Sequence, residues 1–330
     1  MTERKLRFLS AADVVRALPM KDAVAAMRDA FRQLSASQAV MPPRTHIETA
    51  EPPGEALFMP SYIPGVRRMG VKIVTLFGGN AAQGLPRIQG LMVVLDAATG
   101  SPLAVMDGTS LTAIRTGAAS GVATDLLARP DAAVAAVFGA GPQARTQLAG
   151  VCAVRPIRRA RIFDVSAERA RAIAREMAEE LGIQVEAAAS PSEALAGADV
   201  VCTATTASEP VFADRDVSPG THINAVGSYK PTVREIPAET VRRARVVVDH
   251  LPAALAEAGD LIIPMEQGLI AKDHICAELG EIIAGLKKGR ESPEQVTLFK
   301  SVGVAVQDMA AANRVLAAAE RLNLGTDLTL

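Results

Sequence analysis

Aromatic side chains are scarce in this chain of 330 residues, at 3% with no tryptophan, and neither sign of charge is in excess. There are 35 Lys and Arg against 36 Asp and Glu, and like charges do not form blocks. We therefore expect neither nucleic acid nor a membrane surface as a partner. Apolar runs are too short for a signal peptide or a membrane span.

Cysteine is also rare, and the three residues Cys152, Cys202 and Cys276 are widely spaced with no CxxC pair. This spacing argues against a disulfide framework and against a thiolate zinc site. The four histidines show no metal-ligand spacing, and no G-x-S-x-G motif is present. These absences predict a cytoplasmic protein without a metal site.

What the chain does have is apolar residues, at 49%, enough for two domains with substantial cores. Residues 41–65 are dense in proline, which predicts loop and short extended segments. From about residue 132 apolar strands alternate with helices, a pattern typical of a parallel, doubly wound α/β sheet. A long apolar helix is expected after Ser301, packing back onto the N-terminal part.

The stretch VFGAGPQARTQLAGV, residues 137–151, carries a G-x-G-x-x-A fingerprint made by Gly139, Gly141 and Ala144. The first glycine permits a tight turn, the second lets a pyrophosphate approach the backbone, and the small third residue allows close helix–strand packing. Pro142 suits the first helical position, since it needs no N–H partner there. The pattern predicts dinucleotide binding at the start of a helix.

Asp164 ends the next strand, 25 residues after Gly139, close to the spacing of an acid that hydrogen-bonds the ribose hydroxyls. The alternative is that Asp164 only caps the following helix. An acid at this position repels a 2′-phosphate, which favours NAD over NADP. Arg169, one turn further on, could moderate that preference, so NADP stays the alternative.

Three basic residues stand in unusual places in the first part of the chain. Lys72 interrupts an apolar strand, on the same face as Val74 and Leu76. Taken singly, Lys72 could lie at a solvated edge, Arg115 in a surface salt bridge and Arg44 in a solvated loop. Together the three would form a cationic cluster suited to a carboxylate.

The stretches GVKIVTLFGGN, LTAIRTGAAS, VFGAGPQA, INAVGSYKPTVREI and TLFKSVGVAVQD resemble the ornithine cyclodeaminase/mu-crystallin family, in family order over nearly the whole chain. The family includes ornithine cyclodeaminases, archaeal-type alanine dehydrogenases and reductases of cyclic ketimines and pyrroline-2-carboxylate. The resemblance implies a Rossmann domain at residues 125–301. It also implies an α+β substrate and dimerisation domain from residues 1–124 with 302–330, in a homodimer.

By resemblance, Arg44, Lys72 and Arg115 are substrate-binding residues, and Lys72 is also the catalytic candidate, as proton donor. The residues matching cofactor-binding positions are Thr116, Gly139, Gly141, Gln143, Ala144, Asp164, Val226 and Ser301. We hypothesise that an acid, Glu55, balances the cationic cluster.

Two departures from the family pattern bear on the reaction. Ser228 stands where ornithine cyclodeaminases carry an aspartate, and a serine cannot serve as a carboxylate base. Ile88 stands where many relatives have a histidine. These departures favour the reductase branch, so the sequence predicts an NAD(P)-dependent oxidoreductase. The substrate would be a small α-imino or cyclic ketimine carboxylate, reduced to an amino or imino acid, or the reverse.

Two alternatives remain at this point. One is a cyclodeaminase-type lyase that uses NAD transiently to convert L-ornithine to L-proline and ammonia. The other is a crystallin-like protein that binds NAD(P) without catalysis.

Overall fold

The computed structural model describes residues 5–329, whose internal contacts divide the chain into two compact units. The first unit runs to Arg115 and resumes at Val304, and the second comprises Thr116–Gly303. The division falls within helix α3 (Gly108–Leu127). Among residues 5–329, no helix has the length and hydropathy needed to cross a bilayer.

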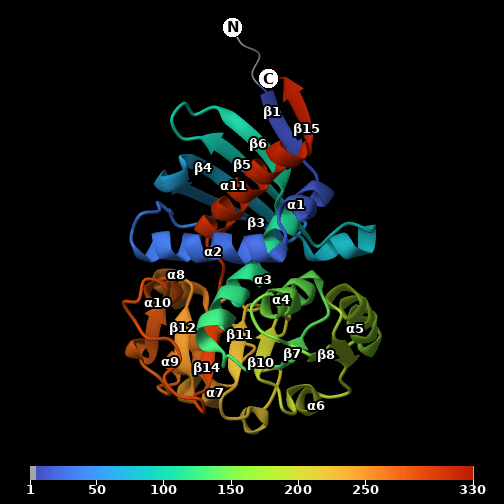
Figure 1. Ribbon diagram of the computed structural model, residues 1–330, viewed down its shortest axis with the longest axis vertical. Helices are drawn as coiled ribbons and strands as arrows, with labels where there is room; N and C mark the ends of the chain where they lie inside the picture. The colour runs from blue at the N-terminus through green and yellow to red at the C-terminus, as the bar shows by residue number, and fades with distance from the viewer. Residues whose placement is uncertain (1–4, 330) are drawn as a thin grey trace. The chain divides into compact units, whose positions relative to one another are not determined.

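The first unit is built on a seven-stranded sheet in the order β15-β1-β6-β5-β4-β3-β2. All neighbouring strands are antiparallel except β1 and β6, which are parallel. Figure 1 shows helix α11 lying across this sheet, with contacts to β3, β4 and β5 and to helices α1 and α2. The elements are β1 (Lys5–Leu9), α1 (Ala11–Ala17), α2 (Met20–Ser35), β2 (Thr45–Thr49), β3 (Gly54–Ile63), β4 (Arg68–Leu76), β5 (Ile88–Asp96), β6 (Pro102–Asp107), α11 (Ala305–Leu322) and β15 (Thr326–Thr329).

The helices of this unit form where local sequence favours them. Ser10 caps α1, since its hydroxyl accepts a hydrogen bond from the Asp13 amide and the Asp13 carboxylate accepts one from the Ser10 amide. On α2, Met27 and Phe31 are fully buried, one turn apart on one face. The apolar helix expected after Ser301 is α11.

Strand β3 corrects the expectation of only short extended segments in the proline-rich region, because it is ten residues long and contains Pro60. Proline cannot donate to a ladder. The Tyr62 amide donates to Val40, away from β4, and Pro60 lies two residues earlier, so its missing N–H falls on that same side. Strand β2 pairs only with residues 54–58 of β3, so Pro60 removes no ladder bond there.

The second unit contains an eight-stranded parallel sheet in the order β13-β12-β14-β11-β10-β7-β8-β9, which confirms the predicted doubly wound architecture. Alternate residues of β7 serve two cores: Ala135 and Val137 face one cluster, Ala136 and Phe138 the other. The strands are β7 (Val134–Phe138), β8 (Arg159–Phe163), β9 (Gln184–Ala187), β10 (Val200–Thr203), β11 (His222–Ala225), β12 (Arg245–Val248), β13 (Ile275–Glu278) and β14 (Thr297–Lys300). The helices are α4 (Pro142–Cys152), α5 (Ala167–Leu181), α6 (Pro191–Leu195), α7 (Ala238–Arg243), α8 (Leu251–Glu257), α9 (Gly259–Glu266) and α10 (Leu279–Ile283).

His274 and Glu278 contact the backbone of segments far from them in the sequence. His274 lies in a short 3₁₀ turn and its Nε2 bonds the Val241 carbonyl, while Glu278 ends β13 and accepts a hydrogen bond from the Leu251 amide. Both side chains form hydrogen bonds with backbone groups of distant segments, and the pattern of neighbouring residues in the sequence does not reveal such bonds.

Candidate active site

Lys72 lies in the middle of the first unit's sheet, not at a solvated edge. Its strand β4 runs between β3 and β5, and its partners in register are Met59 and Met92. All three side chains are buried, Lys72 with 2% of its surface exposed. A lysine between two buried methionines needs a counter-charge, because an isolated buried ammonium is very costly.

The counter-charge is Asp308, in the first turn of α11. Its Oδ1 accepts hydrogen bonds from Lys72 Nζ at 2.9 Å and from Arg115 Nε at 3.0 Å. Arg115 Nη1 also donates to Gln307 Oε1 at 2.5 Å. Arg115 is 5% exposed and Asp308 1%, so the surface salt bridge considered for Arg115 is instead a buried ion pair.

Burial lowers the pKa of the Lys72 ammonium to about 8, although Asp308 acts in the opposite direction. The positive charges of Arg115 and Arg44 contribute to this lowering of the pKa. Arg44 is half-buried in the segment before β2, and its charge reaches Lys72. The structure thus brings the three predicted cations into one electrostatic group.

The sequence reasoning assigned the balancing acid to Glu55, whereas the carboxylate bonded to Lys72 and Arg115 is Asp308. Asp308 lies 236 residues from Lys72 along the chain. The only sequence signal was a lone acid in the quoted stretch TLFKSVGVAVQD. With Lys72 and Arg115 charged, one carboxylate leaves an excess positive charge, which suits a ligand with one carboxylate.

The predicted phosphate-binding turn has the expected geometry. Gly139 has a φ of 104°, and a Cβ there would lie 2.6 Å from the Ala204 carbonyl oxygen, so only glycine fits. A Cβ on Gly141 would meet no atom within 4 Å. Helix α4 starts at Pro142 without a side-chain cap, and Gln143 Oε1 is buried without a partner. An uncapped helix start beside open space fits a pyrophosphate.

Asp164 accepts hydrogen bonds from two backbone segments, and its bond to a ribose hydroxyl stays a prediction. One carboxylate oxygen accepts from the Ala140 amide of the glycine turn, and the other accepts from the Ser166 amide at the start of α5. Arg169 lies 3.3 Å away and 65% of its side chain is exposed. Asp164 therefore ties the glycine turn to the next strand–helix junction, and the largely exposed Arg169 lies beside it.

A second buried acid, Glu235, was not found by sequence reasoning. Its carboxylate accepts hydrogen bonds from the amides of Thr205, Gly227 and Ser228 and from the hydroxyls of Thr203 and Thr205. Burial and the neighbouring Asp260 raise its pKa. Glu235 thus fixes the loops that follow β10 and β11, at the carboxyl end of the sheet, where open α/β sheets bind ligands.

The remaining cofactor candidates are all in this unit. Ser301 donates its hydroxyl proton to Asp249 at 2.7 Å, so its oxygen keeps only acceptor capacity. The Val226 amide donates to the Thr203 carbonyl, directly after β11. Thr116 is 8% exposed and Ala144 is buried against the α4 core.

The two positions that depart from the family pattern are also defined. Ser228 is buried, and its hydroxyl donates to the Val233 carbonyl. Ile88 is exposed at the first residue of β5. Neither side chain offers an acid or a base.

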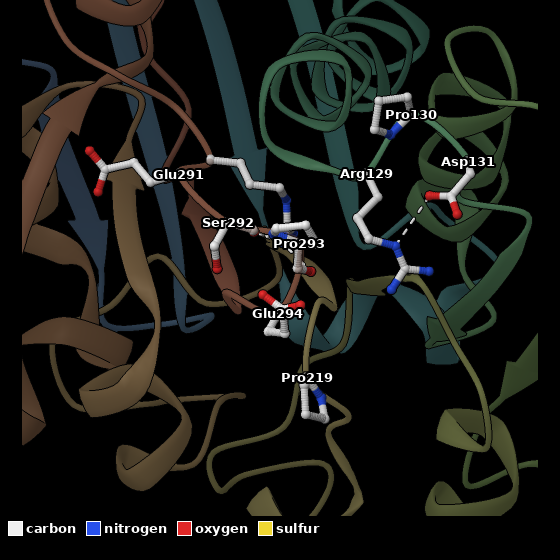
Figure 2. Close-up of a pocket in the computed structure, with 9 residues that line it drawn as sticks. Arg129, Pro130, Asp131, Pro219, Glu291, Ser292, Pro293 and Glu294 are labelled. Carbon is white, nitrogen blue, oxygen red and sulfur yellow. Dashed lines mark hydrogen bonds and ion pairs between the residues drawn. The ribbon is translucent and has the colours of Figure 1, made fainter.

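A hollow of about 610 Å³ lies elsewhere in the second unit, at the amino ends of its strands (Figure 2). Its cations are already engaged: Arg129 pairs with Asp131 and Asp199, and Arg290 donates to several backbone carbonyls, among them Leu127. The lining residues are Arg129, Pro130, Asp131, Pro219, Arg290, Glu291, Ser292, Pro293 and Glu294. This hollow therefore lacks the unsatisfied groups of a ligand site.

Comparison with known proteins identifies the family of this chain. Residues 4–322 match the model of the ornithine cyclodeaminase/mu-crystallin family. A Δ1-pyrroline-2-carboxylate reductase of Bacillus cereus is 41% identical over 305 residues, which cover 92% of this chain and 94% of the relative.

Solved structures agree. The Δ1-pyrroline-2-carboxylate reductase of Thermococcus litoralis, in complex with NADH and L-proline, has a TM-score of 0.95 and 44% identity, over 98% of this chain and 100% of the other. An archaeal alanine dehydrogenase dimer with bound NAD has a TM-score of 0.92 and 35% identity, over 99% of each chain. The chain belongs to the ornithine cyclodeaminase/mu-crystallin family.

Proposed function

We propose that this protein is an NAD(P)H-dependent reductase of small α-imino or cyclic ketimine carboxylates, with Δ1-pyrroline-2-carboxylate as the first substrate to test. The observation that supports this most directly is the buried group of Lys72, Arg115 and Asp308, which carries excess positive charge and a proton donor. The same site run in reverse is an amino-acid dehydrogenase.

We assign the substrate to the first unit and the dinucleotide to the second. NADH is the expected cofactor, since Asp164 disfavours a 2′-phosphate and relatives with known structures bind NADH or NAD. The proposed cofactor contacts are Thr116, Gly139, Gly141, Gln143, Ala144, Asp164, Val226 and Ser301. By analogy with the alanine dehydrogenase dimer, we propose a homodimer, which light scattering would test.

The residues of the cluster have distinct tasks in this proposal. Arg115 and Arg44 hold the substrate carboxylate, the guanidinium fork matching its two oxygens. When bound, NADH supplies a hydride to the imine carbon. The ammonium of Lys72, whose pKa is about 8, donates a hydrogen bond and a proton to the imine nitrogen. The C=N bond thereby becomes a C–N single bond bearing one added hydride and one added proton.

Lyase chemistry is the rival. The Ser228 hydroxyl is bonded to the Val233 carbonyl and offers no carboxylate, which argues against an acid–base role on an ornithine amine. Incubation with L-ornithine and a catalytic amount of NAD tests this rival directly. Proline and ammonia produced without net cofactor change would establish it and overturn the reductase proposal.

The test of the proposal follows nicotinamide absorbance and product formation together. NADH and NADPH are each paired with Δ1-pyrroline-2-carboxylate, Δ1-piperideine-2-carboxylate, or pyruvate plus ammonia. One NADH oxidised for each amino acid formed supports a reductase and ranks the substrates. Binding of NADH without turnover of any imine would instead favour a crystallin-like binding protein.

A further inference from the structure

The start of α11 supplies two adjacent side chains, Gln307 and Asp308, to the two cations of the candidate site. Asp308 Oδ1 accepts from both Lys72 and Arg115, at 2.9 and 3.0 Å. Gln307 Oε1 accepts from Arg115 and from the Val304 amide. All of these side chains are at least nine-tenths buried, so their geometry is fixed by packing as well as by hydrogen bonds.

We propose that Asp308 is a positioning residue for imine reduction, which holds the Lys72 ammonium and the Arg115 guanidinium as a charged pair at a set separation. This inference rests on the function proposed above. In it, Asp308 acts on the substrate only through the two cations that it bonds.

The physical reason is the balance of charge around Lys72. The charged groups that act on Lys72 are Asp308 from α11, Arg115 from α3 and Arg44 from the segment before β2. Its neighbours on β3 and β5 are methionines, which offer no compensation. Asp308 is thus the acid that offsets burial and repulsion at Lys72, and it lies in the first turn of α11.

Removing this charge has two consequences that differ from simple loss of stability. Without Asp308, burial and the two arginines drive Lys72 toward the neutral amine, which cannot donate a proton to an imine. Lys72 and Arg115 also lose their common acceptor and move apart. We therefore expect both a changed pH dependence and weaker binding of the substrate carboxylate.

The test compares Asp308→Asn with Glu320→Gln, a matched acid-to-amide change at an exposed position of the same helix. The pKa of Lys72 is measured from its ¹³Cε shift, assigned by loss of that signal in Lys72→Arg. Steady-state kinetics with NADH and the best imine run from pH 6 to 9. In Asp308→Asn we expect the Lys72 pKa to fall below about 7 and KM to rise about tenfold. The decrease of kcat/KM at alkaline pH should then begin at a correspondingly lower pH.

Asp308→Glu keeps the charge but moves the carboxylate by one methylene. We expect it to restore the Lys72 pKa to near 8 while KM stays raised, and it supplies the answer if Asp308→Asn does not fold. Glu320→Gln should match the unmodified protein in every measurement. An unchanged Lys72 pKa in Asp308→Asn, with kcat lowered equally at all pH values, would overturn the proposal.

Failure of the proposed function gives a different pattern. If the unmodified protein reduces no imine, the reductase proposal falls. The ¹³Cε titration still decides whether Asp308 keeps Lys72 charged. If Asp308→Glu also leaves the Lys72 pKa far below 8, the carboxylate charge is not what sustains the ammonium, and the positioning role is refuted independently of turnover.

Discussion

Replacing Lys72 with arginine should change the pH dependence of imine reduction in a defined way. In the unmodified protein the pKa of Lys72 is about 8, lowered from 10.5 mainly by burial. About nine-tenths of the lysine is then protonated at pH 7 and about one-tenth at pH 9. Because the protonated form is the donor, kcat/KM should be highest below pH 8 and should fall about tenfold for each pH unit above it.

An arginine at this position stays protonated throughout that range and is a poor proton donor. We therefore expect Lys72→Arg to lower kcat/KM at pH 7 by about 10²- to 10⁴-fold and to abolish the fall between pH 8 and 9. The assay is initial-rate NADH oxidation at saturating NADH from pH 6 to 10. Lys21→Arg, on the exposed face of α2, is the control and should retain the full alkaline limb.

The substrate imine also titrates, which provides the decisive comparison. A decrease of kcat/KM above pH 8 that is caused by titration of the imine would persist unchanged in Lys72→Arg. A decrease that is caused by titration of Lys72 would disappear. Persistence of the limb would refute Lys72 as the proton donor. It would leave only the carboxylate-binding role for this residue.

Four further predictions concern the second unit. Gly117→Ala should destabilise the protein by about 1–3 kcal/mol in urea unfolding, because a Cβ there would lie 2.1 Å from the Thr146 carbonyl oxygen. Gly141→Ala, where a Cβ meets no atom, should leave stability unchanged but weaken NADH binding measured by fluorescence; equal effects of the two variants would contradict this. Asp164→Ala should lower the NADH-to-NADPH ratio of kcat/KM about tenfold, and an unchanged ratio would remove Asp164 from cofactor selection. His222 has a pKa lowered from 6.5 to about 3 by burial, so the unfolded chain binds the extra proton between these values and stability falls as pH falls through that window. From pH 7 to pH 5 the free energy of unfolding of His222→Gln should therefore decrease by about 2 kcal/mol less than that of the unmodified protein.

The glycine turn between β7 and α4 was predictable because its determinants are local. Gly139, Gly141 and Ala144 lie within six residues, and the conformations they permit follow from their missing or small side chains. The parallel sheet was predictable for a similar reason, since strand–helix alternation is written in consecutive residues. Lys72 was also visible, as a charge inside an apolar strand.

The partners of these residues were not predictable. Asp308 meets Lys72 across 236 positions, and Glu235 collects amides from two loops that sequence does not show to be adjacent. Strand β3 was missed because a proline such as Pro60 usually marks the end of a strand. The strand tolerates Pro60 because β2, on the side of the missing N–H, does not pair with this residue. Strands β1 and β15 were missed because each is short and stable only in its pairing.

Strand β1 pairs with β15, and α11 packs on the first sheet, so the first unit contains both the first and the last segments to be synthesised. This arrangement affects the order in which the two units can fold. Domains generally fold as units during synthesis, the earlier ones first. Here the strand that carries Lys72 leaves the ribosome early, whereas Asp308 follows only after the whole of Thr116–Gly303 has been made. The second unit can therefore fold before α11, the last helix of the first unit, has been made. A nascent chain lacking α11 would have to bury Lys72 beside Arg115 without Asp308 as counter-charge. In truncated products, we therefore expect the first sheet to be the part that fails to fold.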